Sequence, residues 1–193
     1  KKFKAVQTGG PSGGCLTEKH LDIQIDFDSL TAAGSMMGSG GMIVMDEDDC
    51  MVSIAKFYLD FTVEESCGKC APCRIGNKRL NEMLEKICEG KGTLHDLDLL
   101  RNLSHVVKDT SLCGLGQTSP NPVLSTMDNF MDEYLAHVVD HKCPSGQCKA
   151  LLQYIIEPEN CVGCTACARN CPVNAIAGER KGVHVIDQET CIK

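Results

Sequence analysis

The chain has 193 residues, a net charge of −7 and 14 cysteines, and only 4% of its residues are aromatic. The acidic balance argues against nucleic acid and anionic membranes as main partners, and no apolar run approaches the roughly 20 residues of a transmembrane segment. The start of the chain has no apolar stretch of the signal-peptide type, so we expect a cytoplasmic, reducing environment. Because most cysteines fall in tight clusters, metal binding explains them better than disulfides do.

Residues 1–48 predict a small β-domain. Segment 21–27 alternates apolar and polar residues, as a half-buried strand does, and segment 40–46 indicates a second, more buried strand. The glycine runs at 9–14 and 34–41 have no nucleotide-binding pattern, so we expect turns there rather than phosphate-binding loops.

Residues 49–140 change to an apolar period of 3.6 and predict four amphipathic helices, which would form a bundle. The second helix is expected from about Pro72. The third begins at Thr93, with Asp96 as the partner in a capping box. The fourth is expected to be capped by Asn121 and to continue through an unbroken apolar side.

Three cysteines in the pattern C-x2-C-x2-C, namely Cys67, Cys70 and Cys73, lie at the mouth of the second predicted helix, and Cys113 lies on the loop before the fourth. Three ligands from one tight loop and one from a distant loop are typical of a [4Fe–4S] cluster. Arg74 and the helix N-terminus would add a positive field beside this anionic cluster. A zinc ion with four cysteine ligands is the alternative, although zinc sites usually pair two C-x2-C units.

The segments ESCGKCAPCRIG (65–76) and SLCGLG (111–116) resemble the family of NADH-oxidising flavoprotein subunits of respiratory complex I. They are closer still to the beta or diaphorase subunits of NAD(P)-linked, electron-bifurcating [FeFe] hydrogenases. The resemblance implies an α+β fold in which a soluble-ligand-binding β-grasp domain precedes a four-helix bundle carrying the [4Fe–4S] cluster. It also implies that the chain is the C-terminal part only, with FMN and NAD(P) bound by a domain upstream of residue 1.

The segment CVGCTACARNCP (161–172) has the pattern C-x2-C-x2-C-x3-C-P of bacterial ferredoxins, so the tail is expected to be ferredoxin-like. The segments IEPENC (156–161) and IDQETC (186–191) align with each other, which makes the last cysteine resemble the first ligand of a second, incomplete run. The predicted cluster ligands of the tail are Cys161, Cys164, Cys167, Cys171 and Cys191.

His141, Cys143 and Cys148 form an H-x-C-x4-C run between the helices and the tail, which matches half or more of a structural zinc site. His137, one helical turn earlier, is an alternative ligand. The resembled hydrogenases imply a zinc ion at this join, which would suit Cys50 as the fourth ligand. Two spare thiols beside solvated histidines are the other interpretation.

These predictions together describe an electron conduit with no catalytic residue of its own. The resemblance implies two partners, a thioredoxin-like [2Fe–2S] subunit and a larger iron–sulfur subunit carrying the hydrogenase site. The alternatives are a diaphorase subunit of a complex I homologue or of an NAD-dependent formate dehydrogenase, a lone ferredoxin-like carrier, and a zinc-stabilised scaffold without redox function. The predicted domains are 1–48 (β-grasp), 49–140 (iron–sulfur bundle), 141–157 (zinc-binding linker) and 158–193 (incomplete ferredoxin-like domain).

Overall fold

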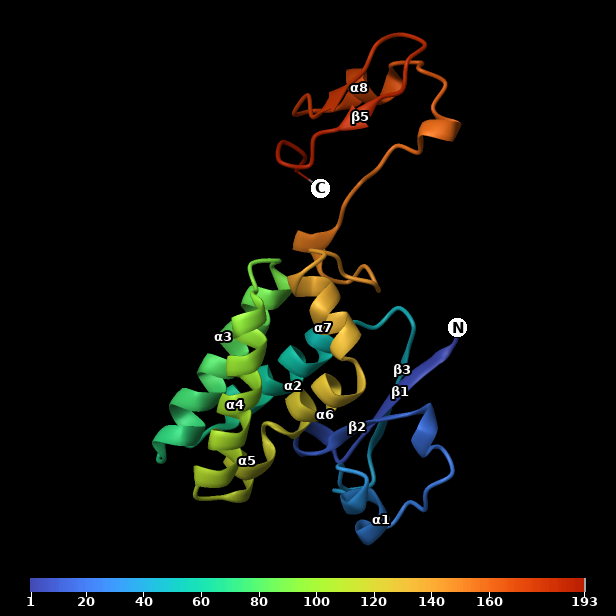
Figure 1. Cartoon of the computed structure of the whole chain (residues 1–193). Helices are drawn as coiled ribbons and strands as arrows, with labels where there is room; N and C mark the ends of the chain where they lie inside the picture. The colour runs from blue at the N-terminus through green and yellow to red at the C-terminus, as the bar shows by residue number, and fades with distance from the viewer. Residues whose placement is uncertain (193) are drawn as a thin grey trace. The chain divides into compact units, whose positions relative to one another are not determined.

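The computed structural model describes residues 1–192, and these fold into two compact units. The first unit is Lys1–Leu151, and the second begins at Leu152 (Figure 1). None of the helices among the described residues has the length and apolarity needed to cross a membrane. The finer division at residues 48, 140 and 157 stays a prediction.

The first unit opens with a three-stranded antiparallel sheet in the order β2–β1–β3. Its strands are β1 (Phe3–Thr8), β2 (Gly14–Thr17) and β3 (Met42–Asp46). Strand β2 packs against helix α6 (Asn121–Asn129). There the Cys15 N–H donates to the Ser125 hydroxyl at 2.9 Å, and the Asn129 side chain donates to the Cys15 carbonyl at 3.2 Å. The sheet is therefore fixed to the helices by its own backbone groups.

The two predicted strands have different outcomes. Segment 21–27 is not a strand, because it forms turns and bends that lead into helix α1 (Phe27–Ala32). The reason is local capping: the Asp26 carboxylate accepts a hydrogen bond from the Ser29 N–H at 2.7 Å and so starts a helix. Segment 40–46 is confirmed as β3, but it lies at the edge of the sheet with its first three residues exposed.

Helices between residues 51 and 138 supply the core of the first unit. Helix α2 packs against α3 and α6, and α4 also packs against α3 and α6, so these four helices lie side by side (Figure 1). The bounds are α2 (Met51–Glu65), α3 (Asn77–Cys88), α4 (Leu94–Thr110), α5 (Gly114–Thr118), α6 (Asn121–Asn129) and α7 (Met131–Val138). The buried apolar side chains between them include Leu59, Leu80, Leu84, Leu100, Val123 and Met127.

The predicted fourth helix is divided at Phe130 into α6 and α7. The backbone of Phe130 has φ −137° and ψ 39°, which lies outside the helical region. Its side chain packs against an apolar cluster on the sheet that includes Ala5 and Met45, and the Lys4 ammonium lies 6.0 Å from the centre of its ring. This contact with the sheet outweighs the helical periodicity that continues through Phe130 in the sequence.

The predicted caps hold at one helix start and fail at another. Thr93 and Asp96 form the expected capping box at α4, in which the Thr93 N–H donates to the Asp96 carboxylate at 2.7 Å. Asn121 does not cap α6, because Pro120 occupies the capping position. The Asn121 side chain instead donates to the Ser12 carbonyl at 2.9 Å and so helps to hold the sheet.

The second unit has short elements around one antiparallel pair. They include η5 (Pro158–Asn160), α8 (Ala166–Asn170), β4 (Ile176–Ala177) and β5 (Val185–Ile186). Gly163 has φ 65°, and a Cβ added there would lie 2.5 Å from the Cα of Lys181. Glycine is therefore required where these two segments meet, and the Lys181 N–H donates to the Gly163 carbonyl at 3.0 Å.

Candidate metal centres

The loop after α2 carries three of the four cysteines predicted to hold the first cluster. These four, Cys67, Cys70, Cys73 and Cys113, are called the first cysteine group. Gly68 in the loop has φ 74°, a left-handed conformation that favours glycine, and its carbonyl accepts a hydrogen bond from Arg74 at 3.0 Å. The chain then forms a π-helical turn, η3 (Pro72–Gly76), that runs directly into α3. The second predicted helix thus begins with an irregular turn of a kind frequent at functional sites.

Cys73 is buried and has two polar side chains at its sulfur. The Asn77 amide donates to the Cys73 Sγ at 3.4 Å, and the Ser66 hydroxyl lies 3.3 Å from the same atom. Asn77 is itself fully buried, and its carbonyl oxygen accepts from the Ser119 hydroxyl at 2.7 Å. Asn77 therefore ties Cys73 to the segment that follows Cys113, a role that no spacing pattern in the sequence indicates.

Cys113 stands immediately before α5, which packs against both η3 and α4. Hydrogen bonding with the backbone of Leu112 and of Cys73 lowers the pKa of the Cys70 thiol. The packing of α5 on η3 brings the segment that begins at Cys113 onto the C-x2-C-x2-C run. The four predicted ligands thus lie on two adjoining segments.

Gly116 allows this close approach. A Cβ added there would lie 2.4 Å from the Ser111 Oγ and 3.0 Å from the Cys73 Cβ. Cys67 and Cys113 are exposed, whereas Cys73 is buried. Thiolates that receive N–H donors from the backbone and from a buried amide fit an anionic iron–sulfur cluster, whose stability and potential depend on such bonds.

Two of the tail cysteines lie along one cavity. Cys171 and Cys191 line the same cavity of about 300 Å³ in the second unit. The sulfur of Cys171 accepts a hydrogen bond from the Ala175 N–H at 3.3 Å. Cys164 is exposed and Cys167 is half-buried.

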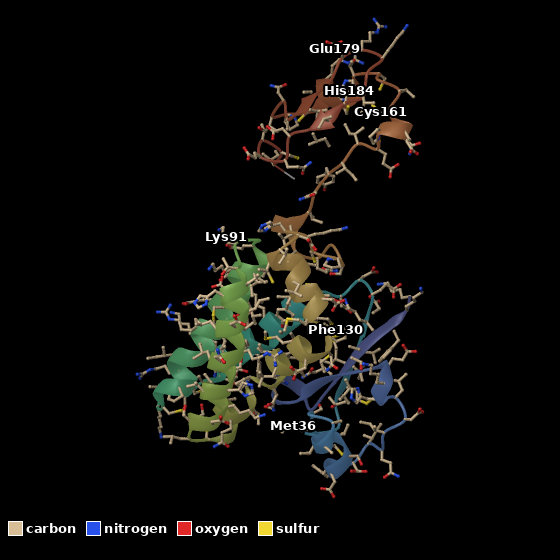
Figure 2. All side chains as sticks on the ribbon, in the orientation of Figure 1. Met36, Lys91, Phe130, Cys161, Glu179 and His184 are labelled. Atoms are coloured by element: carbon tan, nitrogen blue, oxygen red, sulfur yellow. The ribbon has the colours of Figure 1, made fainter. Side chains whose placement is uncertain are left out.

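Cys161 lies beside a buried histidine that no motif in the sequence indicates. The His184 Nδ1 is 4.0 Å from the Cys161 sulfur, and both residues are labelled in Figure 2. His184 is 1% exposed, and its Nε2 has no hydrogen-bond partner among residues 1–192. Its Nδ1 also lies 3.2 Å from the Gly182 carbonyl. A single histidine carries no spacing signal that could have revealed it.

A third group of metal-ligating side chains lies at the end of the first unit. It consists of Cys50, His137, Cys143 and Cys148, called the Cys–His group, whose ligand atoms all lie within 4.8 Å of one another. Cys50 and Cys148 have their sulfurs 3.8 Å apart, and the His137 Nε2 lies 3.3 and 3.4 Å from them. With Zn–S and Zn–N distances of about 2.3 and 2.0 Å, a tetrahedral zinc site has about 3.8 Å between two sulfurs and about 3.6 Å between sulfur and nitrogen. The spacing of Cys50, Cys148 and His137 is therefore close to that of a tetrahedral zinc site, and Cys143 lies near enough to be the fourth ligand.

His141, the first choice among the predicted histidine ligands, does not join this group. Helix α7 ends at Val138, and His141 lies beyond it in a left-handed conformation, with φ 47° and an exposed side chain. The alternative ligand, His137, is still within the helix and is fully buried. Its Nδ1 lies 2.7 Å from the Glu133 carbonyl, which fixes the ring and leaves Nε2 facing the thiols.

The four side chains of the Cys–His group shift one another's pKa values. The pKa of Cys143 is lowered, because Cys148 and Cys50 donate hydrogen bonds to its thiolate, and the pKa values of Cys50 and Cys148 are raised by their bonds to Cys143. Burial lowers the pKa of His137, but its bonds to Cys143 and Cys50 outweigh burial and raise it to about 10. A bound metal ion displaces such protons, so the metal affinity of the group falls as the pH falls.

Comparison with known proteins identifies two iron–sulfur regions. Residues 53–137 match the family described as the NADH-ubiquinone oxidoreductase-F iron–sulfur binding region, and residues 154–177 match the 4Fe–4S binding domain family. The first match includes every member of the first cysteine group, and the second includes four of the five tail cysteines. The chain therefore contains one region similar to the iron–sulfur binding region of the NADH-oxidising subunits and a second region similar to 4Fe–4S binding domains.

Three relatives define this class more closely. The chain is 65% identical to the NADP-reducing hydrogenase subunit HndC of Solidesulfovibrio fructosivorans, over 95% of its own length and 38% of that protein. It is 40% identical to the F subunit of the NADH-quinone oxidoreductase of Mycobacterium tuberculosis, over 74% of its own length and 32% of the relative. A crystal structure of an NAD+-reducing [NiFe]-hydrogenase in the H2-reduced state superposes with a TM-score of 0.65 and 30% identity, covering 71% of this chain and 23% of that one.

These matches confirm the resemblance expected from the cysteine motifs. The chain is homologous to part of the F subunit of NADH-quinone oxidoreductase and to part of the hydrogenase protein HndC. It spans only 32% and 38% of the length of these two relatives.

Proposed function

We propose that the chain conducts electrons as part of the NAD(P)H- and flavin-linked subunit of a multi-subunit, electron-bifurcating hydrogenase in the cytoplasm. The observation that carries the proposal is the buried side chain of Asn77, which donates to the Cys73 sulfur and accepts from Ser119 in the segment that follows Cys113. The identity of 65% with a hydrogenase subunit, against 40% with a complex I-type subunit, favours the hydrogenase over the complex I alternative.

A [4Fe–4S] cluster, held by Cys67, Cys70, Cys73 and Cys113, would supply one-electron transfer at the first cysteine group. The residues of this chain contribute placement and electrostatics. The Asn77 amide donates to the Cys73 sulfur, and such bonds stabilise the more negative, reduced state. They should therefore raise the reduction potential of the cluster.

The tail is proposed to hold a further cluster, through Cys161, Cys164, Cys167 and Cys171, with Cys191 as a ligand of a second one. FMN and NAD(P) are expected to bind in another part of the same protein. A thioredoxin-like [2Fe–2S] subunit and a larger iron–sulfur hydrogenase subunit are the proposed partners. They would deliver or receive the electrons.

The Cys–His group is proposed to hold a structural zinc ion. Four protein ligands fill a tetrahedral site and leave no position for substrate, so the ion would have no catalytic role. Cys50 begins α2, whereas Cys143 and Cys148 follow α7. Zinc would therefore clamp the two ends of the helical part.

The first prediction tests the ligand set of the proposed cluster. Cys113→Ala removes one of four ligands, so the signal of the first reduced four-iron cluster should be lost from the low-temperature EPR spectrum. Cys15→Ala is the matched control, because Cys15 is equally a thiol but lies buried in the sheet. An unchanged spectrum in Cys113→Ala would exclude Cys113 as a ligand.

A further inference from the structure

A buried ion pair connects the N-terminal sheet with the Cys–His group. The Lys4 Nζ lies 2.5 Å from the Glu133 carboxylate, and the two side chains are only 14% and 8% exposed. Lys4 belongs to β1 and Glu133 to α7. Every other ion pair found among residues 1–192 has at least one partner more than a quarter exposed.

The two residues hold the backbone on both sides of the proposed metal ligand Cys50. The Lys4 ammonium donates to the carbonyl of Asp49, the preceding residue, at 2.5 Å. The second carboxylate oxygen of Glu133 accepts from the N–H of Met51, the following residue, at 3.1 Å. The backbone of Cys50 thus lies between the two partners of one ion pair.

Glu133 also positions a second ligand through its main chain. Its carbonyl oxygen lies 2.7 Å from the His137 Nδ1, which directs the Nε2 toward the thiols. The side chain of Glu133 therefore acts on the residue beside Cys50, and its backbone acts on His137. Figure 2 labels Phe130, the neighbour of this pair, whose ring lies 6.0 Å from the Lys4 ammonium.

We propose that Lys4 and Glu133 are positioning residues for the metal ion of the Cys–His group and couple metal binding to the docking of the sheet. The proposal rests on the metal site proposed above. Partners outside the ligand set orient ligands before the metal arrives and so raise its affinity. Because coupling is reciprocal, metal binding must in turn hold β1 more firmly against the helices.

The test measures zinc affinity by chelator competition and the visible spectrum of the Co2+-substituted chain. Glu133→Gln and Lys4→Met should each weaken zinc binding by about 10- to 100-fold, the usual effect of losing an outer-shell partner. The Co2+ spectrum should change in shape, because the backbone on either side of Cys50 is no longer held in place. Arg101→Met is the control, since it breaks an exposed ion pair with Asp128 and should leave zinc affinity unchanged.

The reciprocal effect separates positioning from a general role in stability. Adding zinc to the metal-free wild-type chain should slow hydrogen exchange at the amides of β1, and Lys4→Met should abolish most of that slowing. A double variant, Lys4→Met with Glu133→Leu, replaces the charges by an apolar pair that a buried site tolerates. It should fold, keep the EPR signal of the first cluster, and still bind zinc weakly.

Three results would overturn the proposal. Zinc affinity equal to that of the wild type in both single variants would do so, as would wild-type affinity in the double variant. Zinc that leaves hydrogen exchange in β1 unchanged would exclude the coupling. If the wild-type chain itself binds neither Zn2+ nor Co2+, the proposed metal site is wrong as well. If the wild type and the variants all bind zinc equally tightly, the metal site stands and only the positioning role of Lys4 and Glu133 is wrong.

Discussion

His137 and His141 are four positions apart, but only His137 lies among the thiols of the Cys–His group. Spacing suggests that either could serve, because residues four apart share a helix face. The helix ends at Val138, however, and the chain turns away before His141. The end of α7 at Val138 therefore determines which of the two histidines faces the thiols.

The second prediction separates these two histidines. His137→Ala should reduce zinc affinity by more than about 100-fold, since losing a ligand costs more than losing an outer-shell partner. His141→Ala should leave the affinity unchanged, because its side chain is exposed outside the group. Zinc content after dialysis against a chelator measures both. Zinc retained in His137→Ala, or lost in His141→Ala, would contradict the assignment.

At the residue scale, the sequence indicates clustered cysteines better than it indicates the groups around them. Cysteines in tight runs carry a spacing signal, so Cys67, Cys70 and Cys73 could be grouped at once. Cys50 had no such signal; the family resemblance suggested it, together with its place at the start of the first predicted helix. Asn77 and Glu133 were missed because they are ordinary helical positions in the sequence, and only the packing shows what they contact.

At the element scale, some local signals succeeded and tertiary contacts overrode others. The capping box at Thr93 was predictable because all its partners lie within one turn. The break at Phe130 was not, because it depends on contact with a sheet more than 80 residues earlier in the chain. The strand prediction for segment 21–27 failed because the cap of Asp26 outweighed an alternating pattern.

The third prediction concerns the start of α4. Burial raises the pKa of Asp96, but hydrogen bonds from Lys86 and Thr93 lower it more, so the net pKa lies below its ordinary value. A lowered pKa means that the charged carboxylate stabilises the fold above the unfolded pKa of about 3.9, and that this contribution is lost as the pH falls through the folded pKa.

Asp96→Asn should therefore reduce the free energy of unfolding by about 1 kcal/mol at neutral pH. The difference from the wild type should shrink as the pH falls below about 4. Urea unfolding of both proteins, compared at each pH, measures this difference. A difference that stays constant into strong acid would show that the charge of Asp96 does not contribute.

At the scale of the whole molecule, the two units carry different parts of the proposed conduit. The first unit holds the first cysteine group and the Cys–His group, and the second holds the tail cysteines. Both iron–sulfur regions could be recognised from the sequence, because each ligand run is short and specific. The docking of β2 on α6 could not, since it rests on single hydrogen bonds between distant segments.

The proposed function requires this chain to carry iron–sulfur clusters together with one zinc ion. The most direct test is the iron, acid-labile sulfide and zinc content of the anaerobically purified chain, with an EPR spectrum after reduction. We predict about four irons and four sulfides for the first cysteine group, more if the tail is filled, and about one zinc. Zinc without iron or sulfide would contradict the account and would favour a zinc-stabilised scaffold.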